Sequence, residues 1–178
     1  MMSLKLHTPE TWTGSSDAPV IVTPGLVFER RQAIPEHFSE KIQDAVKDFM
    51  RSSGMPSGVD LKGFYYQTLQ AIAESAIWGQ GRELWLGTLG DDLYTYILAS
   101  IGHDFDGRLA YTVSQAWVKE DQRGQMWVKD AWQKVRQRAK DTLCSHFVVH
   151  STKQDTDAYC RFLGKGFHKV SEILKEEL

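Results

Sequence analysis

The stretch VKEDQRGQMWVKDAWQKVRQRAK, residues 118–140, decides the fold of this chain. It leads from the β-forming segment LAYTVSQAWV (109–118) into a run with helical periodicity over residues 127–141. The segment SHFVVHS (145–151) follows as a second strand. A strand, a helix and a strand in this order predict two parallel strands that lie side by side. The charged turn around Gly124 is then either a plain connector or a place where backbone N–H groups hold an anion.

The remaining segments predict one mixed sheet. Two apolar runs split by Pro24-Gly25 indicate one or two short strands, and Asp106-Gly107 gives a strong hairpin signal within an antiparallel meander. The expected elements, in order, are strand segments within 19–31, helices over 35–50 and 59–78, strands over 83–89, 93–102 and 109–118, a helix over 127–141, a strand over 145–151, a helix over 155–163 and a strand over 167–174.

The predicted fold class is α/β in the mixed α+β sense. We expect a mostly antiparallel central sheet with helices on both faces and one parallel strand pair, 109–118 with 145–151. Residues 1–19 are polar and carry Pro, Gly and Ser, so they are interpreted as an N-terminal arm. Residues 20–178 are expected to form a single domain with its own core.

Composition limits the classes of function. The chain has 21 Lys+Arg against 23 Asp+Glu and a net charge of -2, which argues against a broad nucleic-acid surface. No apolar run reaches the roughly 20 residues of a membrane helix. The first residues lack the apolar core of a signal peptide, so a cytoplasmic protein is expected.

Metal binding is not expected either. Cys144 and Cys160 have no metal-type spacing and are interpreted as reduced thiols. His146 and His150 lie four residues apart in a predicted strand, a span of about 13 Å that is too long for two ligands of one ion.

The order of elements and two stretches resemble the GNAT family of acyl-coenzyme A-dependent N-acetyltransferases, most clearly over residues 83–174. In that family a strand ends in a turn of pattern Arg/Gln-x-x-Gly-x-Gly/Ala, which opens a helix and holds the coenzyme A pyrophosphate. The stretch WVKEDQRGQMWVKDAW looks like this turn, with Arg123 at its first position. The stretch DTDAYCRFLGKGFHKV is similar to the family's C-terminal helix and turn through Ala158, Phe162 and Gly166-Phe167. The nearest resemblance is to GNAT-like proteins encoded by tailed bacteriophages.

This resemblance implies acetyl-coenzyme A as cofactor and acyl transfer to an amine whose identity stays open. Backbone N–H near Trp117 and Val118 would polarise the acyl carbonyl in the splayed opening between the parallel strands. Tyr159 is the candidate general acid, because Phe162 stands where many family members have a tyrosine. The implied cofactor-binding residues are Trp117, Val118, Arg123, Gly124, Gln125, Met126, Trp127, Val128 and Asp155, the last of which also suits a helix N-cap.

Three departures support a second hypothesis. Met126 and Val128 stand where the family has small residues, and Phe162 has no proton to give. The fold would then be kept without catalysis, in a binding protein or a virion-associated structural protein. Under either hypothesis a phage-encoded chain would act in the host cytoplasm or in the virion. Phage virion proteins and a second copy of the chain are the open partners.

Several conspicuous residues also have plain structural interpretations. Trp127 and Trp132 fall on the apolar stripe of helix 127–141 and are expected in the core, and Trp117 either packs there or flanks the pantetheine arm. Tyr65-Tyr66 either line an acceptor pocket or place one ring in the core and one at the surface. Arg123 is either a solvated turn charge or a pyrophosphate contact. The basic run Lys134, Arg136, Arg138 and Lys140 is interpreted as a solvated helix face.

Overall fold

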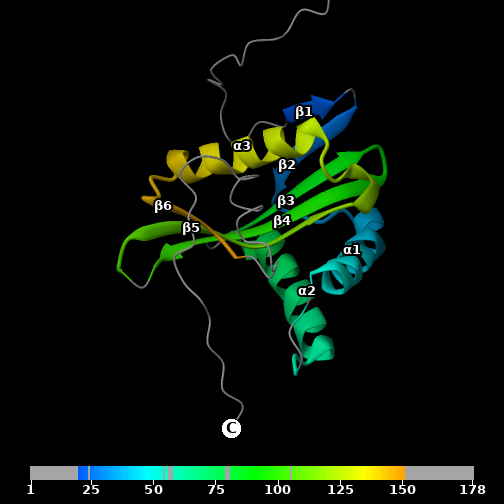
Figure 1. The fold of residues 1–178 in the computed structure, drawn as a ribbon, viewed down its shortest axis with the longest axis horizontal. Helices are drawn as coiled ribbons and strands as arrows, with labels where there is room; N and C mark the ends of the chain where they lie inside the picture. The colour runs from blue at the N-terminus through cyan, green and yellow to red at the C-terminus, as the bar shows by residue number, and fades with distance from the viewer. Residues whose placement is uncertain are drawn as a thin grey trace, which may run out of the picture.

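The computed structural model describes residues 20–23, 25–53, 55, 58–78, 81–104 and 106–150 (Figure 1). The elements are β1 (Val20–Thr23), β2 (Leu26–Arg31), the 3-10 turn η1 (Glu36–Phe38), α1 (Ser39–Ser52), α2 (Leu61–Trp78), β3 (Arg82–Leu89), β4 (Asp92–His103), β5 (Leu109–Val118), the 3-10 turn η2 (Glu120–Gln122), α3 (Met126–Asp141) and β6 (His146–Val149). The predicted arm 1–19, helix 155–163 and strand 167–174 lie outside the described residues.

The six described strands form one sheet in the order of the sequence, β1-β2-β3-β4-β5-β6. Neighbours from β1 to β5 pair antiparallel, and β5 pairs parallel with β6 over Ala110–Val113 and His146–Val149. The expected meander and the expected parallel pair are therefore both confirmed. The β4–β5 hairpin turns at Gly107, whose φ of +78° is the left-handed conformation that glycine adopts without strain.

Helices cover both faces of this sheet, as predicted (Figure 1). On one face α3 packs onto Phe28, Trp85 and Tyr111 through Trp127, Trp132 and other residues of its apolar stripe. On the other face α1 and α2 bury Ile42, Val46 and Ile72 against Leu84, Tyr96 and Trp117. Both tryptophans of α3 thus belong to the core, as expected. None of the described helices is long and apolar enough to span a membrane.

Helix ends follow the expected local chemistry. Asp60 caps α2, because its Oδ1 accepts a hydrogen bond of 3.0 Å from the Gly63 amide. A 3-10 turn after Pro35 precedes α1, so the regular helix begins later than predicted. Tyr65 is half-buried and Tyr66 is exposed, which is the plain interpretation of that pair.

A β-bulge at Ser114 changes the facing of β5. On β4 the residues Leu98 and Ala99 are adjacent, whereas their partners on β5 are Gln115 and Val113, so Ser114 is an extra residue. Val113 packs in the core under α3, but Trp117 packs in the core under α1 and α2. The two ends of β5 therefore present odd-numbered side chains to opposite faces.

The basic run on α3 was wrongly interpreted as a solvated face at two of its four positions. Lys134 is buried, with 4% of its surface exposed, and Arg138 forms an ion pair with the buried carboxylate of Glu83. The reason is helical periodicity, because positions 127, 131, 134 and 138 lie along one face of a helix. The outward face of α3 includes Lys140, which is exposed.

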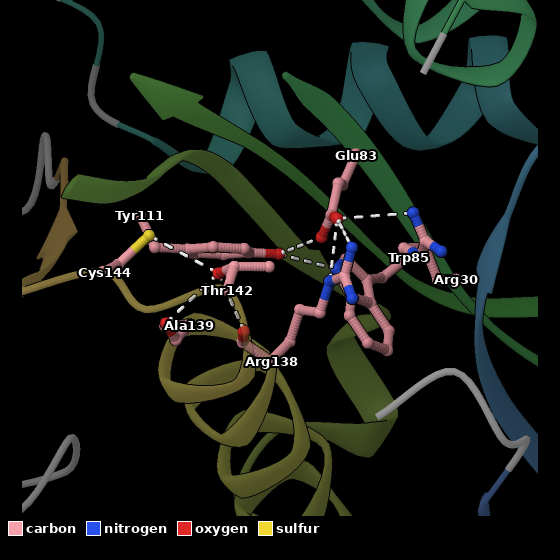
Figure 2. A network of polar contacts seen from close by, with 8 residues as sticks. All are labelled: Arg30, Glu83, Trp85, Tyr111, Arg138, Ala139, Thr142 and Cys144. Carbon is pink, nitrogen blue, oxygen red and sulfur yellow. Dashed lines mark hydrogen bonds and ion pairs between the residues drawn. The ribbon is translucent and has the colours of Figure 1, made fainter. Parts of the chain in front are cut away.

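The Glu83 carboxylate is the centre of a polar network between the sheet and α3 (Figure 2). Its Oε1 accepts hydrogen bonds from Arg138 Nε at 2.9 Å and Arg138 Nη2 at 2.7 Å, and one from Arg30 Nη1 at 3.3 Å. Its Oε2 accepts one of 2.7 Å from the Tyr111 hydroxyl, which itself accepts one of 2.9 Å from Trp85 Nε1. The charge of Glu83 is thus paired and hydrogen-bonded, as a buried carboxylate requires.

Candidate functional site

The turn between β5 and α3 is tightly closed by its own backbone. Gln122 donates to the Lys119 carbonyl at 2.9 Å, Arg123 to that of Glu120 at 3.2 Å, and Gln125 to that of Gln122 at 3.3 Å. Gly124 has a φ of +86°, which an L side chain would adopt only with strain. A Cβ placed on Gly124 would meet no atom within 4 Å. The space beside this glycine is therefore open.

Three backbone amides without a hydrogen-bond partner in the described part of the chain lie at the same point. Gln125 is the N-cap of α3 and makes no side-chain capping bond, and Val128 donates to the Gln125 carbonyl at 3.2 Å. The amides of Gly124, Met126 and Trp127 donate no hydrogen bond to another residue within the described part of the chain. Because the N-terminus of a helix also carries a partial positive charge, this group of donors is suited to an anion. We call the amides of Gly124, Met126 and Trp127 the cradle.

The bulky residues that depart from the family pattern do not fill this space equally. Val128 is 4% exposed and packs in the core under α3, so its side chain points away from the turn. Trp127 is also buried in that core, and its indole N–H donates a hydrogen bond of 3.4 Å to Gln122 Oε1 of the turn. Met126 is 72% exposed and is flexible, so it is the single departing side chain beside the cradle.

Arg123 is engaged with neighbouring elements. Its Nε donates a hydrogen bond of 3.1 Å to the Val118 carbonyl, and its Nη2 lies 3.7 Å from Asp48 Oδ2. The same Asp48 oxygen accepts a hydrogen bond of 2.7 Å from Trp117 Nε1. Two residues that the sequence singled out, Trp117 and Arg123, thus meet at one carboxylate of α1.

Beside this turn, the edge of β5 pairs with no other strand that the structure describes. The parallel ladder ends at Val113, whose carbonyl accepts a bond of 2.9 Å from the His150 amide, and no described strand pairs with the rest of this edge. The Lys119 amide donates a hydrogen bond to the Tyr94 carbonyl of β4. Because successive backbone N–H groups of a strand point to opposite sides, the Val118 N–H points away from β4 and the Trp117 N–H points toward it. Of the two amides that the resemblance implies for polarising a carbonyl, only that of Val118 points toward this edge.

The face under α2 carries a buried polar chain. The Tyr96 hydroxyl donates to Gln115 Oε1 at 3.2 Å, and Gln115 Nε2 donates to Thr68 Oγ1 at 2.9 Å. Burial raises the pKa of Tyr96 far above its usual value, and the nearby Asp48 carboxylate raises it further. Tyr96 therefore holds its proton too tightly to serve readily as an acid.

Tyr111 is similarly unsuited to act as a general acid. Its burial, then the negative charge of Glu83 and the hydrogen bond to it, raise the pKa of Tyr111 well above the usual range.

Some predicted site residues lie outside the described residues. They are Tyr159, Asp155 and the second motif with Ala158, Phe162 and Gly166-Phe167. Within the described residues no group of three or more His, Cys, Asp or Glu side chains is arranged to hold a metal ion.

No protein-family model matches the sequence, and the search of curated proteins finds no match. Solved structures do match. A predicted acetyltransferase from Clostridium acetobutylicum, crystallised with acetyl-CoA, is 9% identical with a TM-score of 0.61, over 85% of this chain and 96% of the other. A ribosomal-protein-alanine N-acetyltransferase from Brucella melitensis biovar Abortus 2308 is 11% identical with a TM-score of 0.59, over 85% and 99%. This chain has the GNAT fold.

One of the matching structures is not named as an enzyme. A transcriptional regulator from Bacillus halodurans C-125 is 17% identical with a TM-score of 0.62, over 86% of this chain and 99% of the other. At these identities the likeness establishes the fold alone, because one fold carries many functions. The case for function depends on the cradle and the open edge of β5 in this chain.

Sequence reasoning missed Asp48 and the Tyr96–Gln115–Thr68 chain. Asp48 gave a weak signal, since an acidic residue lies there at the edge of the apolar stripe of α1 formed by Ile42, Ala45, Val46 and Phe49. The hydrogen bonds of Gln115 to Tyr96 and Thr68 gave no signal in the sequence. Strict alternation along 109–118 would place Gln115 on the α3 face, and the bulge places it under α2.

Proposed function

We propose that this chain is an acyltransferase that moves an acetyl group from acetyl-coenzyme A to an amine. The observation that carries the proposal is the cradle, three amides at the start of α3 that have no hydrogen-bond partner among the described residues and lie beside an open space. A diphosphate needs several N–H donors and close backbone approach, and both are available at Gly124. The GNAT fold and the acetyltransferases that share it support the same function.

The residues present fit coenzyme A. The cradle amides would hold its diphosphate, with Val128 turned into the core and Met126 free to move aside. Bound coenzyme supplies an activated thioester. The chain's own contribution is positional, because it holds the acyl donor at the free edge of β5 where an amine can approach. On this proposal the Val118 N–H, which points to that edge, stabilises negative charge on a carbonyl oxygen.

The test removes one cradle donor without removing the helix. Proline is well tolerated at the first position of a helix, and it has no N–H. Gln125 has φ -68° and ψ 150°, the conformation that a residue before proline prefers. Met126→Pro should therefore leave α3 intact and weaken coenzyme A binding about tenfold relative to Met126→Ala, since a hydrogen bond to a charged group is lost.

Isothermal titration with coenzyme A measures this difference, and circular dichroism checks that helix content is equal in the two variants. Equal affinity of Met126→Pro and Met126→Ala for coenzyme A would show that the amide of residue 126 does not contribute to binding, which contradicts the role proposed for the cradle. No heat and no thermal shift for the wild-type chain at millimolar coenzyme A would overturn the proposed function itself.

A second candidate is a GNAT-fold binding or structural protein without turnover, including a virion component. Met126 favours it, because a large side chain at the first residue of α3 lies beside the amides that a diphosphate would approach. Release of free thiol from acetyl-coenzyme A in the presence of an amine panel separates the two. Sustained release supports the acyltransferase, and binding without release supports the second candidate.

A further inference from the structure

Asp48 joins three parts of the molecule at one oxygen. It lies on α1, accepts the indole N–H of Trp117 from β5 at 2.7 Å, and lies 3.7 Å from the guanidinium of Arg123 in the turn. Arg123 is fixed a second time by its hydrogen bond to the Val118 carbonyl. We call the group of Asp48, Trp117 and Arg123 the clasp.

The clasp fixes the orientation of the Arg123 guanidinium and opposes its charge. A guanidinium is planar with its donors in fixed directions, so holding Nε on one acceptor and Nη2 near another also orients the remaining N–H groups. Its charge is already opposed by a carboxylate. Asp48, in turn, places a negative charge near a site proposed for a diphosphate, which is unfavourable unless Arg123 stays close to neutralise it.

We propose that Arg123 and Asp48 are positioning residues, which hold turn 119–125 against β5 and α1 so that the cradle amides face the diphosphate. On this proposal Arg123 acts through the backbone it orders and does not contribute its charge directly to the ligand. The inference rests on the proposed function and adds to it the residue of α1 on which the cofactor site depends.

The alternative, direct contact between Arg123 and the diphosphate, predicts effects of a different sign. If Arg123 bound the ligand directly, Asp48→Asn would release the guanidinium and remove a repelling charge, so coenzyme A would bind more tightly. If Arg123 positions the turn, Asp48→Asn loosens it and coenzyme A binds about threefold more weakly. An asparagine can still accept the indole N–H of Trp117, so the change isolates the charge.

The conservative variant Arg123→Lys gives a second discrimination. Lysine keeps the positive charge but cannot reproduce the two fixed contacts to Val118 and Asp48. The clasp therefore predicts that Arg123→Lys and Arg123→Gln both weaken coenzyme A binding about tenfold. Direct charge recognition predicts that lysine keeps most of the affinity that glutamine loses.

The experiment is isothermal titration of coenzyme A into the full chain and its variants at a temperature where thermal unfolding shows each to be folded. Asp44→Asn is the matched control, because Asp44 is one helical turn before Asp48 on α1 and pairs only with exposed Lys47 among the described residues. We expect Asp44→Asn to bind as the wild type does, and Asp48→Asn with Arg123→Gln to be no weaker than Arg123→Gln alone.

Tighter or unchanged binding by Asp48→Asn, or full affinity in Arg123→Lys, would overturn the clasp while the wild-type affinity upheld the proposed function. A wild-type chain that binds no coenzyme A would overturn both. Additive losses of binding free energy in the double variant would also count against a clasp. Once one of two coupled residues is replaced, replacing the other should cost little more.

Discussion

The Tyr111 hydroxyl on β5 donates a hydrogen bond of 2.7 Å to the Glu83 carboxylate on β3, across the width of β4. The same carboxylate receives two hydrogen bonds from Arg138 of α3 (Figure 2). One buried acidic group thus links the strands of the meander to the helix whose first residues form the cradle. The network lies toward the far end of that helix, so its contribution is to the seating of α3 on the sheet.

Loss of this carboxylate should strongly destabilise the fold. Glu83→Ala leaves the guanidinium groups of Arg30 and Arg138 without their shared buried partner, so we expect the free energy of unfolding to fall by about 3 kcal/mol. Urea unfolding followed by circular dichroism measures it. Glu74→Ala, which removes a carboxylate paired with Arg82 at the surface, should cost under about 1 kcal/mol. Equal losses in the two variants would mean that burial of Glu83 adds nothing.

Stability should also depend on alkaline pH through Tyr96. Because its pKa is raised in the folded state, Tyr96 keeps its proton where the unfolded chain releases one, above a pH of about 10. Its contribution is present in full below that pH and decreases as the pH rises. We therefore expect the unfolding free energy to fall between pH 9 and pH 11, and to fall less steeply in Tyr96→Phe.

The control for this measurement is Tyr66→Phe, because Tyr66 is exposed and lacks the burial that acts on Tyr96. The slope with pH is the informative quantity, since loss of the Tyr96–Gln115 hydrogen bond shifts stability by the same amount at every pH. Parallel slopes in wild type and Tyr96→Phe would show that Tyr96 does not titrate differently in the two states.

Gly124 can be tested against another glycine of the same kind. Gly124 and Gly90 both have positive φ, +86° and +57°, and a Cβ on either would meet no atom within 4 Å. Gly124→Ala and Gly90→Ala should each cost about 1 kcal/mol of stability from backbone strain. Only Gly124→Ala should weaken coenzyme A binding, because its methyl group enters the open space of the cradle. Thermal unfolding and titration calorimetry together separate these effects.

Met126→Gly should raise the affinity for coenzyme A. The variant removes the exposed side chain beside the cradle and restores the small residue of the family pattern, so a diphosphate can approach the amides more closely. We expect a gain of about threefold, of the order of one relieved close contact. An unchanged dissociation constant, with Met126→Ala equally unaffected, would mean that the methionine already lies clear of the ligand.

The sequence predicted most of the fold because its elements carry clear local signals. The meander shows β-forming segments separated by Gly90 and Gly107 turns, and α3 shows a long apolar stripe. The ion pair of Arg138 was missed because its partner, Glu83, lies 55 residues away and no local pattern links them. Pairing between distant charges is a property of the tertiary structure.

The position of the turn could be predicted from local signals, whereas its contacts with α1 could not, and coenzyme binding there stays a prediction. Gly124 stands in a contiguous turn between a strand and a helix, and such a turn can be identified from one segment. Asp48 could not be, because its role depends on α1 lying beside the end of β5. The second half of the proposed site, around Tyr159, lies outside the described residues and stays a prediction.

The bulge at Ser114 also decides which backbone N–H groups of β5 point away from β4. Val113 and Gln115 pair with the adjacent residues Leu98 and Ala99 of β4, so Ser114 adds a residue without lengthening the ladder. The Val113 carbonyl points toward β6, so strict alternation from Val113 would direct the Trp117 N–H away from β4 and the Val118 N–H toward it. The inserted serine therefore exchanges the directions of these two neighbouring amides.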